Sequence, residues 1–433
     1  MTTTRLWVAL TLVVGISLAM TACGGGSASS DSAFSSDENV DVSGEKIKVL
    51  LPYQIPQRLL DQFTEESGVE IEYNTAGFDS VLQKLVVANQ AGTYIADVTD
   101  FDWSSTGQFA GNGWYEPLQD ALDPALIEDL GPTNGSFTSD GNLYATCYLN
   151  DFRMSVYNAA MFKEAGIDGF PKTFDELRTT LDELKAKGVA KYPMTIPMGA
   201  TEGSVTPWYM LTLAMGGELF DEDFNPLFND PNSAGYQALQ FEVDALQNGW
   251  VSPGSVTLDD NAAFDAFTGG AAAITLASEP GELATANDPK GSSVAGDAAP
   301  GLLPGIDGPG ASFGLPEGVG IPVTAEHKDA ARAFIEWLVQ PETQTKLYRI
   351  GFLPCGKAAF DQLAKSGELD GGEIVAEQLA QVKPLFAQGA PPWYSQFSSE
   401  AQGLLNAAFK GDITVQEALD QLAERATELA QSS

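Results

Sequence analysis

The stretch Leu143–Asn158 (LYATCYLNDFRMSVYN) concentrates side chains that could bind a polar ligand. Tyr148, Asn150, Asp151 and Arg153 supply hydroxyl, amide, carboxylate and guanidinium groups close together in the chain. Such groups can make paired hydrogen bonds to a hydroxyl-bearing ligand. The local pattern alone fits a half-buried strand with one polar face at least as well. The rest of the chain must decide between a wall of a ligand cleft and an ordinary strand.

Nucleophilic and metal chemistry have little support. Gly310–Gly314 (GASFG) matches the G-x-S-x-G nucleophile pattern, but it lies in a Gly/Pro-rich stretch instead of between a strand and a helix. The single histidine, His327, precedes a predicted helix and fits an exposed helix-start residue. Asp221–Asn225 begins like a calcium loop, but Pro226 replaces the required Gly and Asn232 stands where Glu is needed, so we predict a hairpin turn. The sequence therefore indicates no catalytic residue, no metal and no cofactor.

The composition bounds the class of protein. A chain of 433 residues, 44% of them hydrophobic, has room for two lobes or domains with real cores. Its 59 acidic and 22 basic residues give a net charge of −37, which argues against a nucleic-acid partner and disfavours a strongly anionic ligand. A glycosidase needs two opposed carboxylates, and among so many acidic residues such a pair carries no information. A surface carbohydrate enzyme and a sensor-type binding protein remain alternatives.

The N-terminus has the features of a bacterial lipoprotein signal. Leu6–Met20 is an apolar segment too short to span a membrane comfortably, and MTAC at Met20–Cys23 resembles a lipobox with Met in the usual place of Leu. We predict a signal peptide at residues 1–22, acylation of Cys23 and a flexible tether at residues 23–45. The protein would then be anchored to the outer face of the cytoplasmic membrane without a transmembrane helix. An ordinary cleaved signal peptide is the alternative.

Strand and helix patterns alternate after the tether. The first elements that we predict are the strands Ile47–Leu51, Val69–Tyr73 and Tyr94–Val98, with the helices Gln57–Glu66 and Phe78–Gln90 between them. Such alternation favours a mostly parallel α/β sheet, in which ligands bind beyond the carboxyl ends of the strands. Tyr53, Gln54, Asp100, Asp102 and Trp103 are candidates on this ground.

Helical patterns dominate the rest of the chain. Ala271–Leu276 is a predicted strand. The predicted helices are Thr173–Lys187, Pro207–Ala214, Asn232–Asn248, Asp260–Phe267, Lys328–Val339, Thr343–Ile350, Gly371–Pro384, Gln396–Lys410 and Thr414–Gln431.

Several characteristic stretches follow one another between about residues 46 and 430. They include ADVTDFDW, GNGWYEPLQDAL, LYATCYLNDFRMSVYN, AFTGGAAAITLASEPGELA and PPWYSQFSSEAQGLL. No single stretch is diagnostic. Their order and spacing resemble the extracellular solute-binding proteins of ABC transporters, specifically the sugar-binding group related to maltodextrin-binding protein.

This resemblance implies a two-lobed α/β fold of the periplasmic-binding-protein type II class. Lobe 1 would comprise residues 46–145 and 320–365, and lobe 2 would comprise residues 146–319 and 366–433. The chain would cross between the lobes at Leu143–Asn150, at Phe313–Ile321 and near Phe360–Gly372.

The resemblance also implies a function. The protein would capture a neutral mono- or oligosaccharide in the cleft between its lobes, close on it as a monomer, and deliver it to an ABC transporter permease. A polyol or another small polar solute is the alternative ligand, and few basic residues disfavour a sugar phosphate. The protein would not be an enzyme.

Aromatic faces and hydrogen-bonding side chains are the groups that match a sugar. The predicted ligand-binding residues are Tyr53, Gln54, Asp102, Trp103, Asn150, Asp151, Arg153, Trp208, Glu279, Phe313, Trp393 and Tyr394, with Phe78 and Asp100 as further candidates. Core packing is the alternative role for Trp208, Phe313 and Tyr394, and an ion pair within lobe 2 is the alternative for Arg153.

Two cysteines lie in the body of the chain. Cys147 falls in the first crossover, and the family fold places Cys355 near the hinge side of lobe 1. Because a disulfide can persist outside the cell, we predict a Cys147–Cys355 bridge. Two separate buried thiols are the alternative.

Overall fold

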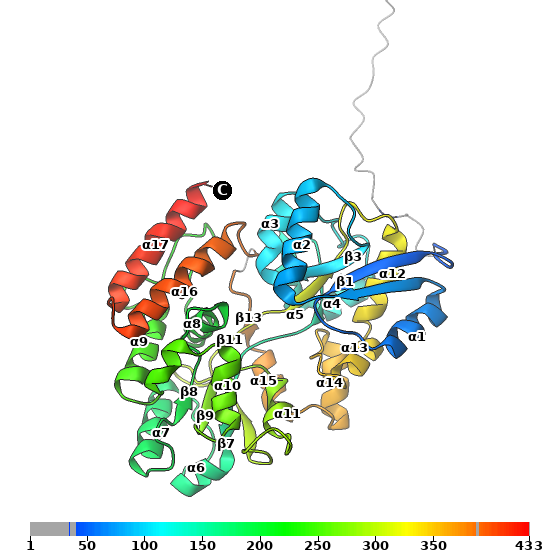
Figure 1. Cartoon of the computed structure of the whole chain (residues 1–433). Helices are drawn as coiled ribbons and strands as arrows, with labels where there is room; N and C mark the ends of the chain where they lie inside the picture. The colour runs from blue at the N-terminus through cyan, green and yellow to red at the C-terminus, as the bar shows by residue number, and fades with distance from the viewer. Residues whose placement is uncertain (1–33, 35–39, 387–388, 433) are drawn as a thin grey trace, which may run out of the picture.

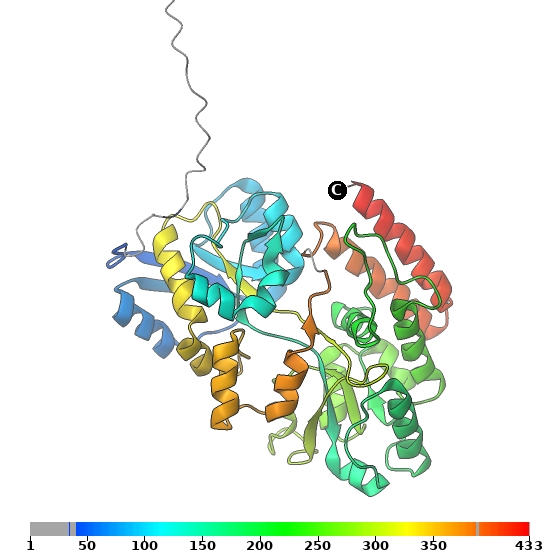
Figure 2. The same cartoon turned by 180° about the vertical axis from the view of Figure 1, so that it is seen from behind.

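The computed structural model describes residue 34, residues 40–386 and residues 389–432. Figure 1 shows two α/β lobes side by side, and the reverse view in Figure 2 shows the chain passing between them. The two-lobed α/β fold predicted from the sequence is confirmed. The predicted signal peptide, Cys23 and most of the predicted tether lie outside the described residues.

Lobe 1 is built on a five-stranded sheet. Its strands, in spatial order, are β2 (Glu70–Thr75), β1 (Lys46–Leu51), β3 (Val98–Asp102), β12 (Glu317–Gly320) and β6 (Thr146–Leu149). β1 runs parallel to β2 and β3, whereas β12 is antiparallel to both of its neighbours. The lobe 1 helices are α1 (Gln57–Ser67), α2 (Phe78–Ala91), α3 (Thr106–Gly111), α4 (Pro124–Asp129), α5 (Gly131–Asn134), α12 (Lys328–Val339), α13 (Pro341–Tyr348) and α14 (Lys357–Ser366).

Lobe 2 is built on a four-stranded sheet. Its spatial order is β10 (Ala298–Gly301), β7 (Met154–Asn158), β9 (Ile274–Ser278) and β8 (Met194–Thr195). The helices around it are α6 (Ala159–Ala165), α7 (Phe174–Ala186), α8 (Glu202–Ala214), α9 (Ala234–Gln247), α10 (Asp260–Thr268), α11 (Glu282–Ala286), α15 (Gly372–Leu379), α16 (Tyr394–Lys410) and α17 (Val415–Ser432). The last two helices pack on each other and on α8 and α9, which places the C-terminus in lobe 2 (Figure 1).

Local sequence signals explain many of these elements. In α1 the buried residues Leu59, Leu60 and Phe63 form one face, and Gly68 ends the helix with a φ of 74°, a conformation that favours glycine. In α7 the Thr173 and Glu176 side chains form a capping box. α12 has the predicted limits.

The structure corrects several predicted boundaries. β3 begins at Val98, where the predicted strand ended. Just before it, the Asp97 carboxylate accepts hydrogen bonds from the backbone of β1 and of the segment before α12. β6, which we assigned to lobe 2, pairs with β12 and belongs to the lobe 1 sheet. The predicted helix Gly371–Pro384 ends at Leu379, and the residues after it form β13 (Val382–Lys383), which pairs with β11 (Ser312–Phe313).

A disulfide fixes the first crossover. Cys147 in β6 is bonded to Cys355, which follows α13, with their Cα atoms 5.8 Å apart. Next to it, the backbone N–H of Asn150 donates to the Leu353 carbonyl, and the Asn150 side chain donates to the Pro354 carbonyl at 3.3 Å. The chain therefore leaves lobe 1 through a segment held at several points.

Within the described residues, none of the helices combines the length and the apolar character that crossing a membrane requires.

The core of lobe 2 contains a buried carboxyl group that makes no hydrogen bond. Glu242 of α9 is fully buried, and neither of its oxygens has a hydrogen-bond partner. Burial raises its pKa well above the ordinary value of 4.5. Protonation in the folded state is therefore favoured, so this carboxyl costs the fold little at low pH and more as the pH rises above its unfolded-state pKa.

We expect Glu242→Met to raise the free energy of unfolding at pH 8 by about 1–3 kcal/mol, because it removes an unpaired buried polar group at similar volume. The gain should shrink at pH 4, where the carboxyl is protonated in the folded state and mostly protonated in the unfolded state. Thermal unfolding at the two pH values measures both effects. Glu424→Met, at an exposed position of α17, is the matched control and should change little at either pH. A loss of stability in Glu242→Met at pH 8 would contradict the argument.

Candidate ligand-binding site between the lobes

Three carboxylates share one face of the lobe 1 sheet. Asp100 and Asp102 are two residues apart in β3, so their side chains point to the same side. Glu317 of β12 stands directly opposite Asp102 in the antiparallel register, which places its side chain on that side too. All three residues are at most 8% exposed. The end of β3 thus gathers three buried acids where parallel α/β sheets bind ligands.

Two tyrosines donate hydrogen bonds to these three acids. Tyr53 follows β1, and its hydroxyl donates to Glu317 Oε1 over 3.4 Å. The Tyr148 hydroxyl of β6 donates to Asp100 over the same distance. Asp102 accepts hydrogen bonds from the backbone and the side chain of Ser104. Glu317 Oε2 is buried and has no partner.

Lobe 2 contributes an ion-pair cluster. Arg153 Nη1 lies 2.7 Å from Asp151 and 3.2 Å from Glu279. Asp151 and Arg153 lie between the first crossover and β7, whereas Glu279 follows β9. β7 and β9 are neighbours in the sheet, which is why these side chains meet. Arg153 and Asp151 are mostly buried, but the Glu279 side chain is 48% exposed, so the cluster reaches solvent on that side.

Burial changes the protonation of these acids. It raises the pKa of Asp102 to about 6 and that of Asp151 to about 7, in the second case against the opposing effect of Arg153. Burial raises the pKa of Glu317 well above its usual range, and the charges of Asp100, Asp102 and Asp151 raise it further. Acids of lobe 1 and lobe 2 therefore act on each other across the interface.

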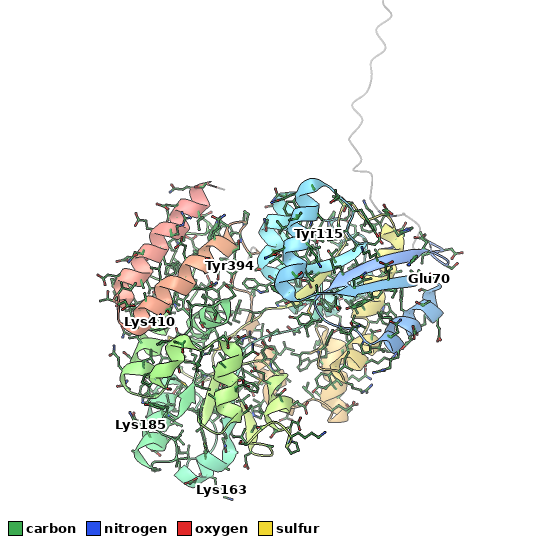
Figure 3. The ribbon with its side chains drawn as sticks, in the orientation of Figure 1. Glu70, Tyr115, Lys163, Lys185, Tyr394 and Lys410 are labelled. Carbon is green, nitrogen blue, oxygen red and sulfur yellow. A yellow bond between two sulfur atoms is a disulfide. The ribbon has the colours of Figure 1, made fainter. Side chains whose placement is uncertain are left out.

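An aromatic cluster adjoins the acids. The Trp103 ring, from lobe 1, lies 4.9 Å from the Tyr394 ring and 5.3 Å from the Phe313 ring, measured between centroids. Tyr209 of α8 packs edge-on against Phe313 at 5.6 Å. The Tyr394 hydroxyl donates to Glu202 over 2.6 Å. Figure 3 shows Tyr394 at the start of α16, on the side of lobe 2 that faces lobe 1.

The lobes also make close backbone contact beside these rings. A Cβ at Gly107 of α3 would lie 2.1 Å from the Ala390 carbonyl oxygen, so only glycine permits this approach. A hollow of about 310 Å³ opens next to it, lined by residues of α3 on one side and by Trp393, Gln396 and the end of α17 on the other.

Two of the predicted ligand-binding residues have other roles in the structure. Trp208 has the core-packing role that we gave as its alternative: the side chain is fully buried in lobe 2, packs against Phe228 and donates from Nε1 to the Gly235 carbonyl. Asn150 holds the hinge segment, as described above. Its amide is therefore committed to the scaffold.

Three further candidates, Gln54, Phe78 and Trp393, differ in how far their side chains are buried. Gln54 is exposed, and its amide donates to the neighbouring Ile55 carbonyl. Phe78 is half-buried at the start of α2. Trp393 is 3% exposed and packs against Phe220 and Phe224 at the edge of the hollow.

The G-x-S-x-G match has no nucleophile. Ser312 lies in β11 and donates its hydroxyl to the Arg153 carbonyl. His327 pairs with Glu45 on the surface, and the Asp221 carboxylate accepts hydrogen bonds from Asn225 in a tight turn. Among the described residues there is also no group of His, Cys, Asp or Glu side chains that could hold a metal ion.

Several site residues escaped the sequence analysis. They are Glu202, Tyr209, Glu282 and Glu317. Glu317 carried a usable signal, because it is the charged residue in the otherwise apolar, glycine-rich return crossover at residues 313–321. The others sit in ordinary helix or strand patterns, and only the packing of the lobes brings them to the cluster.

The family model of the bacterial extracellular solute-binding proteins matches residues 50–345, well over half of the chain. The chain belongs to this family. Among curated relatives, this solute-binding protein is 27% identical over 333 residues to a probable amino-acid ABC transporter periplasmic-binding protein of Sinorhizobium fredii, covering 72% of this chain and 73% of the relative. It is 26% identical over 257 residues to the mannitol-binding protein of Pseudomonas aeruginosa, covering 58% and 57%.

Solved structures agree on the fold. The sugar-binding protein MalE of Xanthomonas citri superposes with a TM-score of 0.77 at 21% identity, covering 89% of this chain and 98% of that one. A solute-binding protein of Thermotoga lettingae, solved with α-D-tagatose, has a TM-score of 0.72 at 24% identity, covering 89% and 100%. A third, from Agrobacterium radiobacter with ribitol, has a TM-score of 0.75 at 20% identity, covering 90% and 100%.

We expect Arg153→Met to destabilise the protein at pH 8 by about 2–4 kcal/mol, because it leaves Asp151 charged without its partner. The loss should be smaller at pH 5, since the pKa of Asp151 is about 7 and its carboxyl is then protonated. Chemical unfolding at both pH values is the measurement. Arg349→Met, which breaks the exposed pair with Glu368, is the control and should cost no more than about 1 kcal/mol. Equal losses for Arg153→Met at the two pH values would rule out this role of Asp151.

Proposed function

We propose that this chain captures a sugar or a polyol between its lobes and presents it to the permease of an ABC transporter. The observation that carries the proposal is the polar cluster supplied by both lobes, with Tyr53, Asp102 and Glu317 on one side and Arg153 and Glu279 on the other. Carboxylate and guanidinium groups pair well with vicinal hydroxyls, and the nearby aromatic rings suit the C–H faces of a sugar.

Binding between the lobes would also couple capture of the solute to closure of the protein. A ligand that contacts both lobes binds the closed state more tightly than the open one and so shifts the population towards closure. Related proteins bind the proposed class of compound, since their names or structures specify mannitol, tagatose and ribitol. The chain would act as a monomer, without a cofactor and without catalytic activity of its own. Incubation with oligosaccharides should accordingly yield no cleavage products.

Another small polar solute is the second candidate ligand. The relative from Sinorhizobium fredii is named as a probable amino-acid binding protein, and it covers more of this chain than the mannitol-binding relative does. An amino acid would use the same carboxylates for its ammonium group, but it would leave the aromatic rings without a matching ligand face.

A thermal-shift screen over sugars, polyols and amino acids tests the proposal, because a ligand that binds only the folded state raises the melting temperature. Stabilisation by a sugar or polyol is the expected result. Trp103→Ala should then weaken that binding about tenfold, since the indole supplies apolar contact area in the cleft. Tyr192→Ala, at an aromatic residue outside the cleft, should leave the affinity unchanged. Stabilisation by amino acids alone would replace the proposed ligand class.

We also propose that the chain is held at the outer face of the cytoplasmic membrane by acylation of Cys23 after removal of residues 1–22. The lipobox-like residues before Cys23 and the Gly/Ser-rich segment after it support this. Cells expressing the chain should incorporate labelled palmitate into it, and Cys23→Ala should abolish the label and release the protein from the membrane fraction. Retention of the label in Cys23→Ala would contradict the anchor. Cys355→Ala, a cysteine substitution elsewhere, is the control and should keep the label.

A further inference from the structure

Carboxylates from the two lobes face each other with little positive charge between them. Lobe 1 supplies Asp100, Asp102 and Glu317. The lobe 2 acids near them are Asp151, Glu202, Glu279 and Glu282. Among the described residues, the basic side chain that pairs with acids of this cluster is Arg153, which contacts Asp151 and Glu279. The charges of Asp102 and Glu202 act on each other, as do those of Asp151 and Glu317, so like charges meet across the interface in both places.

Glu317 is the acid with the least compensation. Its residue is 8% exposed, and its Oε1 accepts one long hydrogen bond from Tyr53. Its Oε2 is buried without a partner and lies on the face that also carries Asp102. A buried carboxylate is costly unless a cation or several hydrogen-bond donors compensate it.

A basic nitrogen compensates the charge of these acids better than a hydroxyl group does. A sugar hydroxyl can donate one hydrogen bond to Glu317 but leaves the charge of the neighbouring acids uncompensated. An ammonium group supplies three donors and a positive charge. The rings of Trp103 and Tyr394, beside Asp102 and Glu202, add faces on which a cation is stabilised.

We propose that the solute is a polyhydroxylated compound carrying a basic nitrogen, of the amino-sugar class, whose ammonium group binds Glu317 and the adjacent acids of β3. This rests on the proposed function, because it places the solute between the lobes. The hydroxyl groups of the solute then meet Arg153, Asp151 and Glu279 on lobe 2. The cation removes the repulsion between the two lobes, and so it favours the closed state for a reason that a neutral sugar lacks.

Matched sugars test the charge directly. The full chain is titrated calorimetrically at pH 6.5 with D-glucosamine, D-galactosamine and D-mannosamine, each beside its parent hexose and its N-acetyl derivative. Each set keeps the ring configuration and the other hydroxyl groups and changes the substituent at C2, which carries the positive charge in the amino sugar alone. At least one amino sugar should bind tenfold or more tightly than both of its neutral counterparts. Equal or tighter binding by the neutral counterparts, or no binding by any amino sugar, would overturn the inference.

The result also separates this inference from the proposed function. If neutral sugars or polyols bind and amino sugars do not, the proposed function stands and the charged ligand is wrong. If the wider panel of sugars, polyols and amino sugars fails to bind at all, both are wrong.

Glu317→Gln locates the effect, because it keeps the shape of the side chain and removes its charge. It should reduce the preference for the amino sugar over its parent hexose at least tenfold. Glu242→Gln, at a buried carboxyl of the lobe 2 core, is the control and should keep the preference. An unchanged preference in Glu317→Gln would overturn the assignment of the ammonium to this residue.

Proton release gives a second readout on the unmodified protein. Burial raises the pKa of Asp102 to about 6, of Asp151 to about 7 and of Glu282 to about 8, so these groups carry protons at pH 6.5 to different extents. A bound cation should displace protons from the cluster. The groups that share its field are Tyr53, Asp100, Tyr148, Arg153, Glu202, Glu279 and Glu317. Titrations in buffers of different ionisation enthalpy should show proton release with the amino sugar and not with the hexose; the same release with both would count against the inference.

Discussion

The carboxylates that face each other across the lobe interface are the constraint on which the rest of the site depends. Asp102 and Glu317 come from lobe 1, and Asp151 and Glu279 from lobe 2, so bringing the lobes together concentrates negative charge in a poorly solvated place. Arg153 offsets part of this charge and orients two of the acids. Under our proposal, a bound solute that supplies donors or positive charge would complete the compensation, and this would couple its binding to closure.

The positions of the lobe 1 acids are set mainly by the register of strand pairing and less by contacts of their side chains. The pairing of β12 with β3 puts Glu317 beside Asp102, and glycine at position 318 is required because a Cβ there would lie 2.8 Å from the Phe101 carbonyl oxygen. The disulfide from Cys147 to Cys355 and the hydrogen bonds around it fix the neighbouring crossover. The lobe 1 acids are thus anchored on paired strands, and the first crossover beside them is fixed as well.

The aromatic rings at the interface pack against one another. Trp103 packs against Tyr394 and Phe313 across the lobes, so these rings contact one another and are at most 8% exposed. A sugar that stacks on Trp103 therefore exchanges a ring contact for a ligand contact. This exchange would limit the net gain from stacking, so we expect selectivity to come mainly from the polar cluster.

Local sequence by itself determined the α/β class and most helices, because apolar periodicity and caps such as Thr173 act over short distances. It also pointed to Asp102 and Trp103, which follow directly from a strand end. It could not separate Trp103 from Trp208, since the exposure of an indole depends on which lobe packs over it. Tertiary structure alone decided that Glu317 joins the acids of β3, because strand register between distant segments brings them together.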